Sequence, residues 1–202
     1  MKLYYSRGAC SLSVRITLQE IGIPYEQESV NLKTKKTESG VDYFTINPKG
    51  AVPALELANK EVLTENVAIQ QYLADEYKAT PLLPPVGNFK RYRVLEWLSY
   101  ISSDLHKSFA PLFNPTISQE IKDQYFMPPL KQKFEWIDEH LRKNKFLMGD
   151  QFTLCDIYLF VVSRWLAAFD MDMTLLPNVS RFMTELKKRK AVADSLEEER
   201  LS

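Results

Sequence analysis

The chain is poor in glycine. Among its 202 residues there are six glycines, at positions 8, 22, 40, 50, 87 and 149. This wide spacing excludes the glycine-rich fingerprint of dinucleotide-binding proteins, the phosphate-binding P-loop and the nucleophile elbow of hydrolases. We therefore expect no nucleotide cofactor.

Cysteine and histidine are also scarce. The two cysteines, Cys10 and Cys155, lie far apart, and there are only two histidines. Such a set provides neither a disulfide framework nor the close ligand spacing of a zinc site. We expect no metal and a reducing, cytoplasmic location.

The chain lacks a net charge and a long apolar run. Lys plus Arg and Asp plus Glu are equal at 26 each, which argues against a nucleic acid partner. No stretch approaches the roughly 18 apolar residues of a membrane span, and the N-terminus is too polar for a signal peptide, so no membrane partner is expected.

Apolar residues are abundant, at 45% of the chain, and they form two kinds of pattern. The proline-rich stretch at residues 79–88 separates a region of short, mixed segments from a region of long helices. We predict one domain at residues 1–80, a linker at 81–87 and an all-helical domain at 88–202. The first domain should follow the order β-α-β-α-β-β-α, a small mixed sheet covered by helices.

The predicted elements of the first domain are short. Strands are expected at residues 2–5, 26–32, 52–57 and 61–63, and helices at 11–20, 38–46 and 65–77, the last capped by Thr64.

In the second domain, an apolar residue recurs every three or four positions on one long helix. This seam consists of Val94, Leu98, Ile101, Leu105 and Phe109. A helix over residues 118–143 should break at Pro128-Pro129, and Thr153 with Asp156 resembles a capping box. Asn178 should cap a last helix, with a frayed tail from residue 197.

Cys10 lies at or just before the first turn of the helix predicted at residues 11–20. The unpaired N–H groups and the macrodipole of a helix start favour a thiolate there. The alternative is an inert core cysteine, but the flanking Ser-Arg-Gly-Ala and Ser are turn residues. Positions 7 and 13 are Arg and Ser, so a resolving cysteine is missing and the chemistry would be that of a single thiol.

Two further stretches permit both a structural and a functional interpretation. In Asn47-Pro-Lys-Gly-Ala-Val52-Pro53, a trans proline at a sheet edge is the simpler expectation, whereas a cis Val52–Pro53 bond would leave the backbone of Val52 available to an extended ligand. Thr64-Glu65-Asn66 opens a helix. It is either ordinary capping or a site where the helix start receives a carboxylate and Glu65 an ammonium.

Several stretches together resemble one family end to end. They are MKLYYSRGACSLS, NLKTKKTESG, INPKGAVPALEL, LTENVAIQQYLAD, EWLSYISSDLHKSFAPLF and GDQFTLCDIYLF, and they resemble bacterial beta-class glutathione transferases. The resemblance implies a thioredoxin-like N-terminal domain, an all-helical C-terminal domain that forms the electrophile side of the site, and a homodimer.

The resemblance also implies roles for individual residues. Cys10 would contact the glutathione sulfur or form a mixed disulfide with it, and His106 would be a second catalytic residue. The remaining positions that resemble glutathione-binding residues are Lys35, Val52, Pro53, Glu65, Asn66, Ser99, Ser103 and Asp104. Ser99, Ser103 and His106 are spaced i, i+4, i+7 and should form one stripe beside the apolar seam.

Some residues depart from the family pattern. Ser99 stands where Asn is frequent, Asn66 where Gly or Ser is usual, Asp104 where Glu is common and Arg15 where His is frequent. These changes bear on affinity and on the choice of electrophile.

The leading hypothesis is an enzyme of detoxification that transfers the thiolate of its co-substrate glutathione to a small hydrophobic electrophile. One alternative is a glutathione-dependent monothiol oxidoreductase, which Cys10 would favour. Another is a non-catalytic carrier of hydrophobic ligands.

Overall fold

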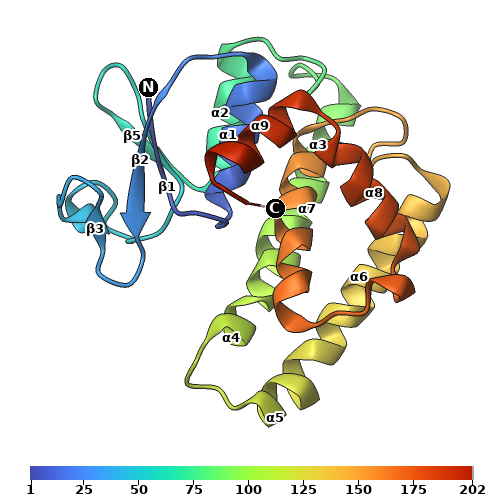
Figure 1. Ribbon diagram of the computed structural model, residues 1–202. Coiled ribbons are helices and arrows are strands. Elements are labelled where there is room, and N and C mark those ends of the chain that lie inside the picture. The colour runs from blue at the N-terminus through green and yellow to red at the C-terminus, as the bar shows by residue number, and fades with distance from the viewer. Residues whose placement is uncertain (202) are drawn as a thin grey trace. The chain divides into compact units, whose positions relative to one another are not determined.

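The computed structural model describes residues 1–201 (Figure 1). It contains two compact units, Met1–Pro85 together with the segment from Lys187 onward, and Val86–Leu186. Within the described residues, no helix combines the length and apolar character needed to cross a membrane.

The first unit is built on a five-stranded sheet in the order β3-β2-β1-β4-β5. The strands are β1 (Lys2–Tyr5), β2 (Glu26–Asn31), β3 (Lys36–Thr37), β4 (Ala54–Glu56) and β5 (Val62–Thr64). β1 and β2 are parallel, joined by helix α1 (Ser11–Ile21), while the other pairs are antiparallel. Helix α2 (Asn66–Glu76) follows β5.

Both faces of this sheet are buried. Neighbouring residues of a strand point to opposite faces, and Leu3 and Tyr4 of β1 are both buried. Leu3 packs in a cluster with Val14 of α1 and Ile69 of α2, whereas Tyr4 packs in a second cluster with Tyr43. The prediction of a mixed sheet with covering helices is confirmed.

Two local predictions for the first unit were wrong. The segment predicted as a helix at residues 38–46 contains only the short 3-10 helix η1 (Tyr43–Thr45), because β3 and a tight turn at Gly40 (φ 88°) precede it. Thr64 does not cap α2. It ends β5 opposite Ala54, and Glu65 occupies the capping position without a side-chain cap bond.

The second unit is made of helices. The α-helices are α3 (Phe89–Tyr100), α4 (Ala110–Phe113), α5 (Gln119–Ile121), α6 (Met127–Lys143), α7 (Leu154–Arg164) and α8 (Pro177–Lys187). Two π-helical segments, η2 (Ile101–His106) and η3 (Lys122–Phe126), continue α3 and α5, and the 3-10 helices η4 (Trp165–Phe169) and η5 (Met173–Leu175) follow α7.

The core of the second unit follows the predicted apolar seam. Val94, Leu98, Ile101, Leu105 and Phe109 are all fully buried. The capping box at Thr153 and Asp156 is present. The helix predicted at residues 118–143 is not interrupted at Pro128-Pro129, because η3 runs directly into α6, and the two prolines lie in the first turn of α6.

The C-terminal predictions were wrong. Asn178 lies inside α8, which begins at Pro177, and its side chain bonds to Asp138. A further helix, α9 (Lys190–Glu198), follows and contacts α1 in the first unit, where Figure 1 shows it in red beside the blue α1. As far as residue 201 the tail does not fray, since α9 continues to Glu198 and Glu199 is buried. The segment from residue 187 therefore departs from the domain expected at 88–202.

Candidate functional site

Cys10 occupies the position predicted for it, directly before the first residue of α1. Its side chain is half-buried, and the thiol donates to the carbonyl oxygen of Val52 over 3.3 Å. The thiol is thus placed at a helix start and held against the backbone of a second loop. This is the geometry expected of a positioned thiol rather than of a core cysteine.

The loop that receives this bond carries the predicted cis proline. The Val52–Pro53 peptide bond is cis, as the family resemblance implied and the simpler expectation did not. β4 begins only at Ala54, so Val52 lies just outside the regular sheet pairing. Its carbonyl points toward Cys10.

The start of α2 lies on the other side of Cys10. Asn66 is buried, and its amide donates to the Cys10 carbonyl over 2.8 Å, while its oxygen accepts from the Ser13 hydroxyl over 2.8 Å. Glu65 is exposed and forms an ion pair with Lys49, which also bonds to the Thr64 hydroxyl over 2.7 Å. The two neighbours differ, since the carboxylate of Glu65 is open to solvent and the amide of Asn66 is turned inward.

Lys35 is the last of the predicted site residues in the first unit. Its ammonium donates to the carbonyl of Gly50 over 2.7 Å, two residues before Val52, and its backbone has a positive φ of 55°. The structure therefore gathers Cys10, Val52, Pro53 and Asn66, with Lys35 and Glu65 next to them.

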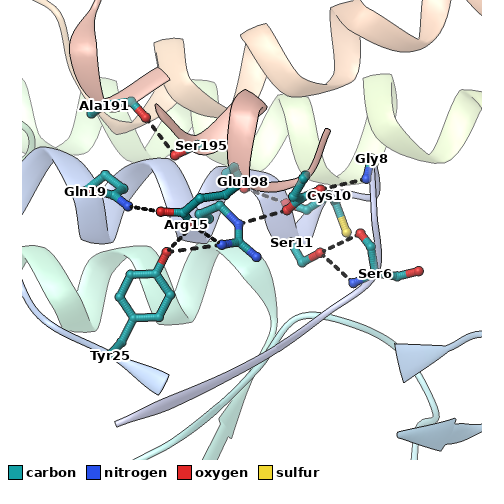
Figure 2. Close-up of polar contacts among 12 residues, drawn as sticks. Ser6, Gly8, Cys10, Ser11, Arg15, Gln19, Tyr25, Ala191, Ser195 and Glu198 are labelled. Carbon is teal, nitrogen blue, oxygen red and sulfur yellow. Dashed lines mark hydrogen bonds and ion pairs between the residues drawn. The ribbon is translucent and has the colours of Figure 1, made fainter. Parts of the chain in front are cut away.

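Sequence reasoning missed a buried ionic cluster behind Cys10. Arg15 of α1 is fully buried; its guanidinium pairs with Glu199 over 3.0 Å and contacts Glu198, and it stacks on the ring of Tyr5. The other carboxylate oxygen of Glu199 accepts from the backbone N–H of Gly8 over 2.7 Å. Figure 2 shows Arg15 between Tyr25 and Glu198, with Gly8 and Cys10 on the loop beside it.

This cluster keeps Arg15 charged. Burial alone would lower the pKa of Arg15, but Tyr25 and Glu199 raise it, and the net direction is upward. A signal was present in the sequence, because Arg15 is the one charged residue in the apolar stretch Leu12–Leu18. Its carboxylate partners, Glu198 and Glu199, lie near the other end of the sequence, so no local pattern around Arg15 indicates them.

In the second unit, His106 turns into the helical core. Its Nδ1 lies 2.7 Å from the Tyr158 hydroxyl, and its ring centroid lies 4.9 Å from that of Trp165. Burial, with a smaller contribution from Lys107, lowers the pKa of His106 to about 4. The imidazole is neutral at neutral pH.

The other three predicted residues of this region face outward. Ser99, Ser103 and Asp104 are exposed, and the Ser103 hydroxyl donates to the Ser99 carbonyl and to Asp104, each over 2.9 Å. Ser103 and Asp104 line a cavity of about 340 Å³ whose wall includes Lys107 and Lys133. The expected single stripe is divided, since η2 is π-helical and its turn is wider than the α-helical spacing assumes.

Aromatic side chains lie beside His106, whose ring contacts those of Tyr158 and Trp165. The rings of Phe109 and Trp165 have centroids 5.3 Å apart, and those of Phe113 and Phe169 5.0 Å apart. Phe113 is 51% exposed. Phe109 is fully buried beneath the other rings, so Phe113, Trp165 and Phe169 form an apolar surface of the kind that contacts hydrophobic small molecules.

Comparison with known proteins gives a consistent result along the whole chain. The N-terminal domain of glutathione S-transferases matches residues 1–75 and the C-terminal domain matches residues 100–190. Glutathione S-transferase GstA of Escherichia coli O157:H7 is 44% identical over 201 residues, with both chains covered completely.

Solved structures agree with the sequence comparison. A sphingomonad glutathione S-transferase in complex with glutathione is 40% identical, with a TM-score of 0.95 and complete coverage of both chains. The bacterial beta-class enzyme of Sphingomonas chungbukensis is also 40% identical, with a TM-score of 0.96 and complete coverage of both chains.

Proposed function

Because the chain belongs to the glutathione S-transferase family and matches its bacterial beta class, we propose that the residues around Cys10 form its glutathione site. The family reaction transfers the glutathione thiolate to an electrophilic carbon. The observation that carries the proposal is the Cys10 thiol bonded to the Val52 carbonyl, with Asn66 at the Cys10 carbonyl.

The charges around this point fit glutathione, which has two carboxylates and one ammonium group. Lys35, held near the loop of Val52 through Gly50, receives the glycyl carboxylate. The exposed carboxylate of Glu65 receives the γ-glutamyl ammonium, while the backbone N–H groups at the start of α2 receive the γ-glutamyl carboxylate. The backbone of Val52 pairs with the cysteinyl unit.

The chemistry requires an anionic sulfur. Glutathione loses its thiol proton, its sulfur attacks the electrophilic carbon, and the leaving group departs with the electron pair of the broken bond. During the transfer Cys10 contacts that sulfur as a hydrogen-bond donor. The alternative contact, a mixed disulfide with Cys10, forms by exchange with oxidised glutathione, which releases reduced glutathione. The site also lowers the entropic part of the activation barrier, because the nucleophile is already held in place when the electrophile binds.

His106 is the catalytic residue that we assign to the second unit. When the Tyr158 hydroxyl donates to Nδ1, the single proton of the neutral ring is on Nε2, and this N–H can donate a hydrogen bond to an anionic sulfur or leaving group. The apolar surface of Phe113, Trp165 and Phe169 takes the hydrophobic electrophile. Ser99, Ser103 and Asp104 are exposed and serve glutathione at a boundary between two copies of the chain.

We also propose that the protein is a homodimer. Trp97 and Tyr100 of α3 and Trp136 of α6 form an aromatic surface, with ring centroids 5.2 to 6.2 Å apart. Trp136 is 54% exposed in the single chain. Such a contiguous aromatic patch is typical of an interface, and a second copy of this chain would cover it.

A cytoplasmic location fits the thiol chemistry. Neither Cys10 nor Cys155 is in a disulfide, and a reducing compartment keeps both thiols reduced.

The test is conjugation of glutathione to an aromatic halide, such as a chlorodinitrobenzene, by the wild type and by Cys10→Ala. We expect clear turnover by the wild type and a partial loss in Cys10→Ala, because His106, the backbone and the thiol of glutathione remain. Absence of turnover with measurable hydrophobic-dye binding would contradict the proposal and favour a carrier.

A second candidate function is a glutathione-dependent monothiol oxidoreductase. The observation that favours it is Cys10 without a second cysteine nearby, since Ser13, three residues on, bonds to Asn66 and to the Cys10 carbonyl. Reduction of a glutathione mixed disulfide in preference to conjugation would favour this activity.

A further inference from the structure

The side chain of Asn66 is directed into the first unit. It is 6% exposed, and its two polar atoms bond to Cys10 and Ser13. The Cys10 carbonyl can only accept a hydrogen bond, so the amide nitrogen of Asn66 must face it. Burial and these two bonds turn both polar atoms of the side chain toward the start of α1.

The bond to Cys10 fixes a particular peptide group. At the start of α1 the Cys10 carbonyl receives the backbone N–H of Ser13 over 3.1 Å, and the Ser13 hydroxyl lies 2.7 Å from it. The thiol branches from the residue that carries this carbonyl. A donor at this carbonyl therefore sets the direction from which the thiol leaves the backbone.

Asn66 is placed to do this by the turn before it. Glu65 has a positive φ of 73°, which directs the chain from β5 into α2 so that the first residue of α2 faces α1. Glu65 itself stays exposed. One tight turn thus directs one side chain to solvent and the next to the reactive cysteine.

We infer that Asn66 is a positioning residue for Cys10, which links the start of α2 to the thiol through the Cys10 carbonyl without touching the ligand by its side chain. The inference rests on the proposed glutathione site, in which the start of α2 holds the γ-glutamyl end. Loss of this hydrogen bond then changes the orientation of the thiol without removing a side-chain contact to the ligand.

The experiment uses two variants of Asn66 and one control. Asn66→Asp keeps the size but replaces the amide donor by an acceptor that faces the Cys10 carbonyl. Asn66→Leu is close in size and neutral, so it separates the lost bond from the added charge. Thr17→Val is the control, because the Thr17 hydroxyl is equally buried and donates within α1 to the Ser13 carbonyl over 2.8 Å.

Four quantities are measured. The rate of Cys10 alkylation by iodoacetamide, without glutathione, is followed by peptide mass spectrometry. The dissociation constant of S-methylglutathione and the kcat and KM for conjugation follow. We expect alkylation to slow about fivefold or more in Asn66→Asp and about threefold in Asn66→Leu, with kcat reduced. Affinity for S-methylglutathione and KM for glutathione should change less than about twofold, and Thr17→Val should match the wild type.

Other results overturn the inference. Unchanged alkylation with weakened S-methylglutathione binding would make Asn66 a ligand contact, and unchanged values of both would leave it no role. Equal slowing in Thr17→Val would show a general loss of packing. If wild-type protein fails to bind S-methylglutathione, the proposed site fails, whereas the alkylation rates still decide whether Asn66 positions Cys10.

Discussion

At the scale of single residues, the two cysteines have opposite surroundings. Cys10 is half-buried at the start of α1 with its sulfur against the Val52 carbonyl. Cys155 is fully buried in α7, with the Thr153 hydroxyl 3.0 Å from its sulfur. The same functional group is therefore accessible in one place and enclosed in the other.

This contrast predicts the order of modification. Burial, and secondarily Asp156, raise the pKa of Cys155 well above its ordinary value, so a reactive thiolate is rare there and reagents are excluded. Limiting iodoacetamide should label Cys10 first, and Cys155 only after denaturation. Peptide mass spectrometry measures the order, and prior labelling of Cys155 in folded protein would contradict it.

His106 should make the free energy of unfolding depend on pH in the acid range. Its pKa is about 4 in the folded protein, below the ordinary 6.5, so the unfolded chain takes up a proton first as the pH falls. The stabilisation from this group is complete above about pH 6.5 and is lost as the pH falls toward about 4. Urea denaturation of wild type and His106→Gln should show this pH dependence only in the wild type, and an identical slope in both would refute the assignment.

At the scale of elements, some helix boundaries follow from short signals and others do not. Three features depend only on neighbouring residues, and they could be predicted. They are the start of α1 after Cys10, the capping box of α7 and the position of the two prolines at the start of α6. The absence of a helix at residues 38–46 depends on the pairing of β3 with β2, and the burial of Glu199 depends on Arg15. Contacts between distant parts of the chain leave no periodic pattern, so sequence reasoning could not find them.

The capping box of α7 should be among the strongest local contributions to stability. Asp156 is fully buried and accepts from the backbone N–H groups of Leu147 and Thr153, each over 2.8 Å. Removing it leaves two buried donors without their partner, so Asp156→Ala should cost about 2–4 kcal/mol of the free energy of unfolding.

Asp172 provides the control for this prediction. It is the N-cap residue of η5, where its side chain accepts from the Thr174 N–H over 2.9 Å, and unlike Asp156 it is exposed. Asp172→Ala should cost less than about 1 kcal/mol in the same urea denaturation. Equal losses in the two variants would show that burial does not set the value of the cap.

The connection between α1 and the C-terminus gives a second prediction for elements. Glu199→Ala would leave the buried guanidinium of Arg15 without its buried carboxylate, at a cost of about 3–5 kcal/mol. Glu197→Ala, an exposed neighbour, should be nearly neutral. Chemical denaturation of both variants measures the difference, and a small effect of Glu199→Ala would mean that the ionic cluster contributes little.

At the scale of the whole molecule, the family and the presence of a mixed α/β part and a helical part could be predicted from the sequence. The end-to-end resemblance to beta-class glutathione transferases is confirmed by relatives that cover the full chain. The orientations of the side chains in the site could not be predicted as well. Asn66 and His106 were found by position, but the inward turn of Asn66 and the separation of His106 from Ser103 depend on the Glu65 turn and on the π-helical segment η2.

The proposed homodimer gives a prediction at this scale. Wild-type protein should sediment as a dimer at micromolar concentration, and Trp136→Glu should shift it toward monomer, because a charge would be buried in the aromatic surface. Leu175→Glu, an exposed apolar residue of η5 outside that surface, should stay dimeric. Monomeric wild-type protein would refute the homodimer.

The central claim is that Cys10 faces the glutathione sulfur, and oxidised glutathione tests it most directly. The Cys10 thiolate would attack one sulfur of the disulfide, form a mixed disulfide and release reduced glutathione. Peptide mass spectrometry of the folded protein should locate the glutathione adduct on Cys10 alone and find none in Cys10→Ala. An adduct on Cys155, or none on Cys10 under conditions in which glutathione binds, would contradict the account.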